Sequence, residues 1–226
     1  MTITVHDNFE QGSERWLEAR RGLITASEMK LILTPTLKVA DNDKTRAHVY
    51  EILAQRISGY VEPTYIGDDM LRGMDDEILA RDLYGKNYAP VREAGFITND
   101  EWGFTIGYSP DGLVGDAGLI ECKSRRQKYQ VQTIANDEVP SEYMLQLQTG
   151  MLVTGREWID FISYSGGLPM FVKRVYPDDD VQAAIIKAAT AFEDKVGEAM
   201  RSYNACLKSM PKVIPTERRI EQEMFA

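Results

Sequence analysis

Two carboxylates and a lysine stand close together near the middle of the chain, in a glycine-containing segment. The segment runs from Ser109 through Asp111 to Glu121, Cys122 and Lys123. Because the side chains of a β-strand alternate between its two faces, Glu121 and Lys123 would share one face of a strand and Cys122 would point to the other. The spacing therefore predicts that a carboxylate and an ammonium group project in the same direction.

A hairpin would bring the second carboxylate to the same place. If residues 113–114 and 119–121 run antiparallel around the intervening turn, Asp111 lies beside Glu121. Mg²⁺ binds one or two carboxylates and completes its octahedral shell with water and phosphate oxygens. Asp111 and Glu121 are therefore candidate Mg²⁺ ligands of a centre for phosphodiester hydrolysis. In such a centre Lys123 would hold and polarise the attacking water or the scissile phosphate.

The same residues also have an ordinary structural interpretation. A Pro-Asp pair followed within about 25 residues by an acid-x-Lys triplet arises by chance in roughly one chain in ten. A glutamate and a lysine two positions apart are commonly a solvated pair worth about 0 to 1 kcal/mol, and Pro-Asp-Gly is commonly a plain turn. Against this interpretation, residues 118–120 and Cys122 are apolar or small. They predict a central strand, where unpaired charges would be costly.

Length and composition favour one domain. The 226 residues are 43% hydrophobic and 27% charged, which is enough for a substantial core over residues 1–226. Pro211 and Pro215 interrupt the pattern after residue 208, so residues 208–226 are expected to form an arm on the body or a partly disordered tail.

The chain has the character of a cytoplasmic protein with no membrane partner. It shows neither an apolar signal-peptide core nor an 18-residue apolar run, and its two cysteines, Cys122 and Cys206, are far apart. With only His6 and His48, a Cys/His zinc site or a histidine-centred catalytic triad is disfavoured.

The net charge of −9 argues against a protein that coats DNA through bulk positive charge. It does not exclude an enzyme that acts on nucleic acid, since metal-binding acids add to the negative count. Basic residues also cluster locally, at Arg15, Arg20 and Arg21 and again over residues 123–128. The ordinary interpretation of each cluster is a solvated face.

Hydrophobic periodicity, together with capping and turn residues, predicts the elements that would position these residues. Helices are expected from Ser13 to Gly22, at the Ser/Thr-x-x-Glu capping box of residues 25–28, and over 45–57, 68–84 (closed by Gly85), 142–153 and 178–207. Strands are expected over 91–98, 103–108, 113–114, 119–121, 158–164 and 170–176. Helices at the start, a central run of mostly antiparallel strands and further helices predict an α/β or α+β domain.

Five separated segments together resemble the phage lambda exonuclease (YqaJ-type) family, within the PD-(D/E)xK nucleases. They are residues 16–28, 73–77, 109–112, 119–123 and 143–148. They occur in order over most of the chain and leave the final 20 residues uncovered. The resemblance implies a restriction-endonuclease-like core, with a central mixed sheet flanked by helices.

The resemblance implies two Mg²⁺ ions, for which Mn²⁺ would substitute. Asp111 and Glu121 would bind them, Lys123 would assist the attacking water, and the backbone carbonyl of Cys122 would be a further metal ligand. Glu77 takes the place of the family's helical glutamate near the metals, although by periodicity alone it belongs to a wet helix face.

Gln146 matches the active-site glutamine of the family. Gln148 does not share its helical face, since positions two apart diverge.

The resemblance also implies a pocket for the 5′-terminal phosphate, formed by Arg20, Ser27 and Ser109. The chemistry suits the role, because the guanidinium fork matches phosphate oxygens and hydroxyls donate to them. Without the resemblance these are a surface arginine, a helix-start serine and a turn serine. Met70 falls where the family has an apolar wedge that parts the duplex, whereas a methionine on a helix face is ordinarily core.

The function implied is a Mg²⁺-dependent, processive 5′-to-3′ exonuclease of double-stranded DNA from a phage or prophage recombination system, acting in the bacterial host. It would bind DNA ends as a homotrimeric ring and leave 3′ single strands for an annealing protein. The alternatives are a restriction-like or repair endonuclease with the same metal centre and a non-catalytic DNA-end-binding scaffold.

Overall fold

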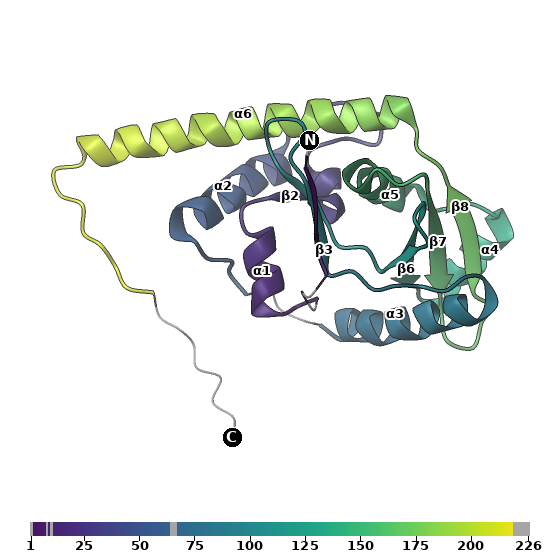
Figure 1. Ribbon diagram of the computed structural model, residues 1–226. Coiled ribbons are helices and arrows are strands. Elements are labelled where there is room, and N and C mark those ends of the chain that lie inside the picture. The colour runs from purple at the N-terminus through teal and green to yellow at the C-terminus, as the bar shows by residue number, and fades with distance from the viewer. Residues whose placement is uncertain (1, 8, 10, 64–66, 219–226) are drawn as a thin grey trace, which may run out of the picture.

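The computed structural model describes residues 2–7, 9, 11–63 and 67–218, with helices around two small sheets (Figure 1). The helices are α1 (Glu14–Arg20), the 3₁₀ helix η1 (Ala26–Leu31), α2 (Asp43–Ser58), α3 (Asp68–Asn87), α4 (Gln127–Asn136), α5 (Ser141–Thr154) and α6 (Asp179–Ser209). The strands are β1 (Ile3–His6), β2 (Ile24–Thr25), β3 (Phe96–Asn99), β4 (Ile106–Tyr108), β5 (Gly112–Val114), β6 (Gly118–Ser124), β7 (Trp158–Tyr164) and β8 (Phe171–Val175). The expected α/β class is confirmed.

The strands form two four-stranded mixed sheets rather than one central sheet. The first has the order β1-β3-β4-β2 and the second the order β5-β6-β7-β8, each with one parallel pair, β2 with β4 and β6 with β7. Ser109, Pro110 and Asp111 connect β4 of the first sheet to β5 of the second. Proline has no N–H group to continue a ladder, so the chain leaves one sheet and enters the next at this point.

The predicted hairpin is present. Strands β5 and β6 pair antiparallel, with Gly112 opposite Ile120, and the turn between them uses the positive φ (53°) of Gly115. Strand β6 also pairs parallel with β7, so β6 is an interior strand of its sheet, and its first five residues are buried. The prediction of a central strand is confirmed.

Helices α5 and α3 cover opposite faces of the second sheet. Ile120 and Cys122 pack with Tyr84 of α3, whereas Leu119 joins the core cluster that includes Leu147 of α5. Side chains alternate along β6, so those of Glu121 and Lys123 share the face of Leu119. The predicted separation of these two side chains from that of Cys122 is confirmed.

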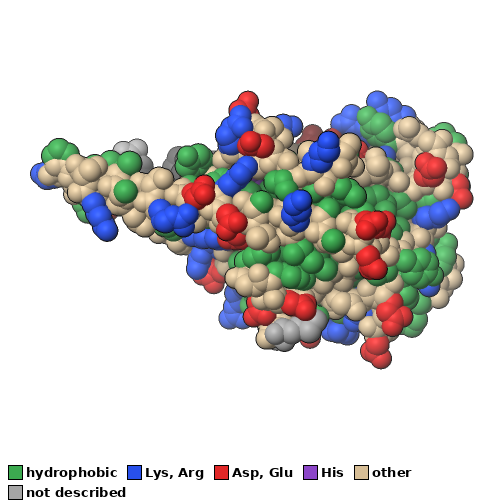
Figure 2. All heavy atoms as spheres, turned by 90° about the horizontal axis from the view of Figure 1, so that it is seen from above, with side chains coloured by type: hydrophobic (Ala, Val, Ile, Leu, Met, Phe, Trp, Pro, Cys, Tyr) green, Lys and Arg blue, Asp and Glu red, His purple; other side chains and the backbone are tan. Residues whose placement is uncertain are grey.

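Helix α6 packs on the body through its first half. Asp178 caps its N-terminus by accepting hydrogen bonds from the backbone of Asp180 and Val181. Its buried residues end at Val196, and the rest of the helix projects beyond the body (Figures 1 and 2). Residues 211–218 after the helix are exposed and have no regular structure, and residues 219–226 of the expected tail lie outside the described residues.

Several expected boundaries were wrong. The chain begins with β1 rather than with a helix; Ile3 and Val5 do alternate with Thr4 and His6, but over only four largely exposed residues of an edge strand. Strands β3 and β4 begin five and three residues later than predicted, at Phe96 and Ile106. Helix α3 continues through Gly85 to Asn87, and the capping-box segment forms a 3₁₀ helix.

Helix α4 was not predicted at all. Its apolar residues Tyr129, Val131 and Ile134 are exposed, while Gln130 and Thr133 are buried. Gln130 is satisfied by the backbone carbonyl groups of Ser163 and Pro169. A helix that buries polar side chains lacks the apolar stripe on which periodicity depends. Among the described helices, none is long and apolar enough to cross a membrane.

Candidate active site

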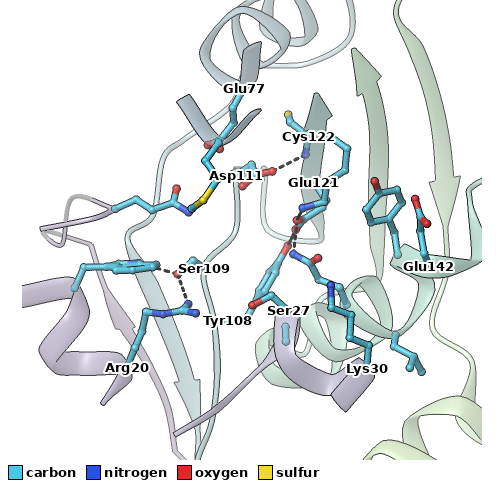
Figure 3. Close-up of a pocket in the computed structure, with 18 residues that line it drawn as sticks. Arg20, Ser27, Lys30, Glu77, Tyr108, Ser109, Asp111, Glu121, Cys122 and Glu142 are labelled. Carbon is cyan, nitrogen blue, oxygen red and sulfur yellow. Dashed lines mark hydrogen bonds and ion pairs between the residues drawn. The ribbon is translucent and has the colours of Figure 1, made fainter. Parts of the chain in front are cut away.

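One cavity of about 600 Å³ receives every residue that the sequence nominated for the site. These residues are Arg20, Ser27, Met70, Glu77, Ser109, Asp111, Glu121, Cys122, Lys123 and Gln146. They come from α1, η1, α3, the connection between the two sheets, β6 and α5 (Figure 3). The tertiary structure thus joins segments that are far apart in the sequence.

Glu121 is the most densely bonded side chain of the cavity. Its Oε2 accepts a hydrogen bond from the hydroxyl of Tyr108 over 2.7 Å. Its Oε1 accepts from Lys123 Nζ over 2.6 Å and from Gln146 Nε2. Burial lowers the pKa of Lys123, but the carboxylates of Glu121 and Asp111 outweigh it and hold that pKa above its ordinary value. Lys123 is therefore a fixed cation beside the carboxylates.

Asp111 is held by the backbone of β6. One oxygen of its carboxyl group accepts a hydrogen bond from the backbone N–H of Cys122, while its own carbonyl accepts one from Arg81 of α3 over 3.2 Å. Burial and the nearby carboxylates of Glu121 and Glu77 raise the pKa of Asp111 well above its ordinary value. Burial likewise raises the pKa of Glu77, which points from α3 toward Asp111 (Figure 3). Negative charge is concentrated here, and a cation would relieve it.

The donor set fits a hard divalent cation. In the part of the chain that the structure describes, no three His, Cys, Asp or Glu side chains are grouped so as to hold a metal ion, so side chains alone do not complete such a site. Asp111 and Glu121 with the Cys122 carbonyl would supply a small oxygen set, and Mg²⁺ commonly keeps several water or phosphate ligands beside one or two carboxylates. Cys122 would contribute to the site through its backbone, because its side chain packs against α3.

Arg20 lies at another part of the cavity, where its hydrogen bonds go to hydroxyl groups and Glu28 acts on it only through its charge. Its guanidinium group donates to Ser109 Oγ over 3.4 Å and to Thr25 Oγ1 over 3.3 Å, and it stacks on the Trp16 ring at 4.2 Å. Ser27 Oγ lies 3.3 Å from Thr25 Oγ1. Within the described residues no carboxylate forms a salt bridge with Arg20. A cation surrounded by hydroxyl groups is suited to bind an anion.

Two further predictions concern the helices. Met70 is 46% exposed, so it is not the core residue that its ordinary interpretation suggested; its role as a wedge stays a prediction. Gln148 points away from the cavity, as expected, and its amide bonds the backbone of Tyr176 and Asp178. It is a structural residue, whereas Gln146 faces Glu121.

Residues 15–157 match the YqaJ-like viral recombinase domain, which is more than half of the chain and contains all ten nominated residues. The chain belongs to the YqaJ-like viral recombinase family. The resemblance seen in the five sequence segments is thereby confirmed. No curated protein sequence matches the chain significantly.

Solved structures agree with membership of the YqaJ-like family. The alkaline exonuclease LHK-Exo from Laribacter hongkongensis is 33% identical, and its match covers 86% of this chain and 100% of that one, with a TM-score of 0.75. A complex of LHK-Exo with dAMP has the same identity and coverage and a TM-score of 0.76. A phage-related exonuclease from Haemophilus somnus 129PT, 15% identical over 80% of this chain and 96% of that one with a TM-score of 0.57, shares the fold.

The sequence did not single out several residues that shape this YqaJ-like site. Tyr108 bonds Glu121, Trp16 Nε1 donates to Ser109 Oγ over 2.9 Å, and Arg81 bridges α3 to the Asp111 loop. Tyr108 and Trp16 adjoin or lie within the matching segments, which was the available signal. Their partners are distant in sequence, so no local pattern reveals these contacts.

The second basic cluster is largely neutralised by neighbouring acids. Arg125 pairs with Glu142 over 2.6 Å and contacts the Tyr143 hydroxyl, and Arg126 pairs with Asp69 over 2.8 Å. Much of this cluster is therefore not available as free positive charge. Lys123 is also paired, with Glu121, but it lies inside the cavity.

Proposed function

We propose that the protein is a Mg²⁺-dependent 5′-to-3′ exonuclease of double-stranded DNA that generates 3′ single strands for recombination. The observation that carries the proposal is that one cavity holds both Asp111, Glu121 and Lys123 and the cationic pocket of Arg20 and Ser109. The 33% identity with an alkaline exonuclease, for which a complex with dAMP is known, supports exonuclease chemistry.

Asp111, Glu121 and the Cys122 carbonyl would hold the metal, with Glu77 close by. Divalent ions held there would supply an activated water and would stabilise the leaving oxygen of a phosphodiester. Mn²⁺, which is also hard enough for carboxylate and carbonyl ligands, would substitute for Mg²⁺.

The chain's own residues orient the reacting groups. Lys123 lines the cavity and has protons beyond the one that it donates to Glu121, and these would bond the scissile phosphate or the attacking water. Gln146 holds the same carboxylate oxygen and would keep the side chain of Glu121 in one position. Preorganised donors of this kind need not rearrange when charge develops in the transition state.

The Arg20 pocket supports the proposed 5′-to-3′ direction of digestion. A 5′-terminal phosphate bound by Arg20, Ser27 and Ser109 would lie beside the carboxylates, because Ser109 precedes Asp111 by only two residues. The adjacent phosphodiester would then reach Lys123. An end with a free 5′-hydroxyl would leave the guanidinium group without its anion, so the pocket selects phosphorylated ends.

We further propose a homotrimeric ring and a single-strand annealing protein as partners, together with Met70 as a wedge that parts the duplex. A ring would let an acidic protein stay on DNA by topology, with positive charge needed only along the channel.

The proposal is tested with linear duplexes labelled at one 5′ end, with and without a 5′-phosphate, in Mg²⁺ and in a chelator. We expect mononucleotides from the labelled end, faster from phosphorylated ends and absent in chelator. Release from the 3′ end, or release that continues in excess chelator, would refute the assignment.

Two controls separate the alternatives. Covalently closed duplex should stay intact, whereas a restriction-like or repair endonuclease would nick it. A DNA-end-binding scaffold would retain labelled ends in a filter-binding assay at every Mg²⁺ concentration and release no nucleotide.

A further inference from the structure

A buried tyrosine controls one oxygen of the proposed metal ligand Glu121. Tyr108 ends β4 of the first sheet, and its hydroxyl donates to Glu121 Oε2 in the second sheet over 2.7 Å (Figure 3). Both residues are only 1% exposed. Breaking this bond would leave a desolvated carboxylate oxygen without a partner, so Oε2 is tied into the protein interior.

The other carboxylate oxygen of Glu121 faces the cavity. Oε1 accepts hydrogen bonds from Lys123 and Gln146, which are partly buried residues of the cavity wall, whereas Tyr108 reaches the same wall but is only 1% exposed. The two oxygens of Glu121 are therefore unequal. Oε2 is held by a residue of the core, and Oε1 lies among the groups that would meet substrate and water.

The fold provides a close-fitting site for the Tyr108 ring. Gly150 of α5 lies against it, and a Cβ atom at that position would come within 2.8 Å of the ring. The ring therefore has little room to turn away from Glu121.

We propose that Tyr108 is a positioning residue that limits Glu121 to one-oxygen coordination of the metal and so favours Mg²⁺ over Ca²⁺. The inference rests on the metal centre of the proposed function. Mg²⁺ requires near-octahedral geometry at short distances, whereas Ca²⁺ takes six to eight oxygens and readily accepts both oxygens of one carboxylate. Lys123 and Gln146 are only partly buried and can move off Oε1 when a metal binds, whereas the buried Tyr108 ring cannot leave Oε2, so the carboxylate offers one oxygen to the metal.

The chain offers a matched control. Tyr84 is likewise 1% exposed, and its hydroxyl donates to the buried carboxylate of Asp160 over 2.6 Å. This pair lies outside the cavity, and Arg174 also bonds Asp160. Tyr84→Phe therefore removes a buried tyrosine–carboxylate hydrogen bond of the same kind without touching Glu121.

The experiment measures Mn²⁺ binding by the whole protein from the electron paramagnetic resonance signal of free Mn²⁺, with Mg²⁺ or Ca²⁺ as competitor. Loss of an outer partner of a metal ligand typically costs about 10- to 100-fold in affinity. For Tyr108→Phe we expect weaker Mg²⁺ binding, with the Mg²⁺-to-Ca²⁺ affinity ratio lowered roughly 10-fold. Tyr84→Phe should keep the wild-type ratio.

A wild-type ratio in Tyr108→Phe would overturn the inference while leaving the metal centre in place. Absence of Mn²⁺ binding by the wild-type protein would overturn both the metal centre and the inference. If Tyr108→Phe does not fold, as judged by circular dichroism, Gly150→Ala serves instead. Its added methyl group would push the ring from its site and should lower the ratio in the same direction, and an unchanged ratio there would equally overturn the inference.

Discussion

Asp111 occupies its position because a backbone N–H of the neighbouring strand holds its carboxylate. Asn at this position would keep an acceptor for the N–H of Cys122 and remove only the charge. Replacement by alanine would instead leave a buried N–H unpaired, at a cost of roughly 1 to 3 kcal/mol. The Asn variant therefore removes the negative charge of Asp111 and keeps the hydrogen bond that holds the side chain in place.

We expect Asp111→Asn to fold normally and to lose Mg²⁺-dependent nucleotide release from linear duplex. Lys123→Ala should lower release by about 100- to 1,000-fold, since it removes one preorganised donor. Asp116→Asn is the control, because Asp116 is an exposed carboxylate in the turn of the same hairpin. Single-turnover digestion measures all three, and wild-type rates in either of the first two would exclude the assigned site.

Arg20 gives a prediction about ends rather than about chemistry. Arg20→Ala should lower the initiation rate on 5′-phosphorylated duplex by roughly 10- to 100-fold, in line with the loss of a charged hydrogen bond. The rate on 5′-hydroxyl duplex should change little. Arg15→Ala removes an equal charge from an exposed position of the same helix. If Arg20→Ala keeps the wild-type preference for 5′-phosphorylated ends, Arg20 does not bind the 5′-phosphate.

At the scale of elements, two glycines differ in whether the packing around them leaves room for a side chain. Gly107 of β4 lies under the ring of Phe96, and a Cβ atom there would come within 2.2 Å of the buried ring. A Cβ atom at Gly85 of α3 would meet no other atom of the described residues within 4 Å, apart from its own helix backbone and chain neighbours. The two glycines look alike in the sequence, yet only one is required by packing.

We therefore expect Gly107→Ala to lower the free energy of unfolding by about 1 to 3 kcal/mol through overpacking. Gly85→Ala should raise that free energy by about 0.5 to 1 kcal/mol, because it removes backbone freedom from the unfolded chain inside a continuous helix. Urea unfolding midpoints measure both changes. A destabilising Gly85→Ala would mean that α3 ends at Gly85 after all.

At the scale of the whole molecule, the proposed function requires an acidic chain to hold an anionic polymer. The net charge is −9, and part of the second basic cluster is paired with Glu142 and Asp69. The first encounter with a DNA end should thus depend on local cations such as Arg20 rather than on the net charge, whereas a closed ring would retain the DNA afterwards. The two stages differ in their response to salt.

Raising the salt concentration should lower the initiation rate steeply and leave the number of nucleotides released per binding event nearly constant. The measurement is digestion with a trap duplex added after initiation, combined with light scattering for the number of chains per particle. A monomeric particle, or a processive run that shortens in parallel with initiation, would contradict the ring.

Local patterns were sufficient to predict the hairpin of β5 and β6, the interior position of β6 and the helix α6. Each of these depends on residues a few positions apart, through strand alternation, turn glycines and helical spacing. The pairing of Glu121 with Lys123 across one strand face belongs to the same class.

Only the tertiary structure decided that the strands divide into two sheets at Pro110, that α4 buries polar side chains, and which partners complete the site. The hydrogen bond from Trp16 to Ser109 spans 93 positions, and Tyr108 reaches Glu121 from a different sheet. Such contacts depend on how whole elements pack, and a single sequence carries no periodic signal for packing between elements. Short-range chemistry therefore nominated the carboxylates and the lysine, and long-range packing determined what holds them in place.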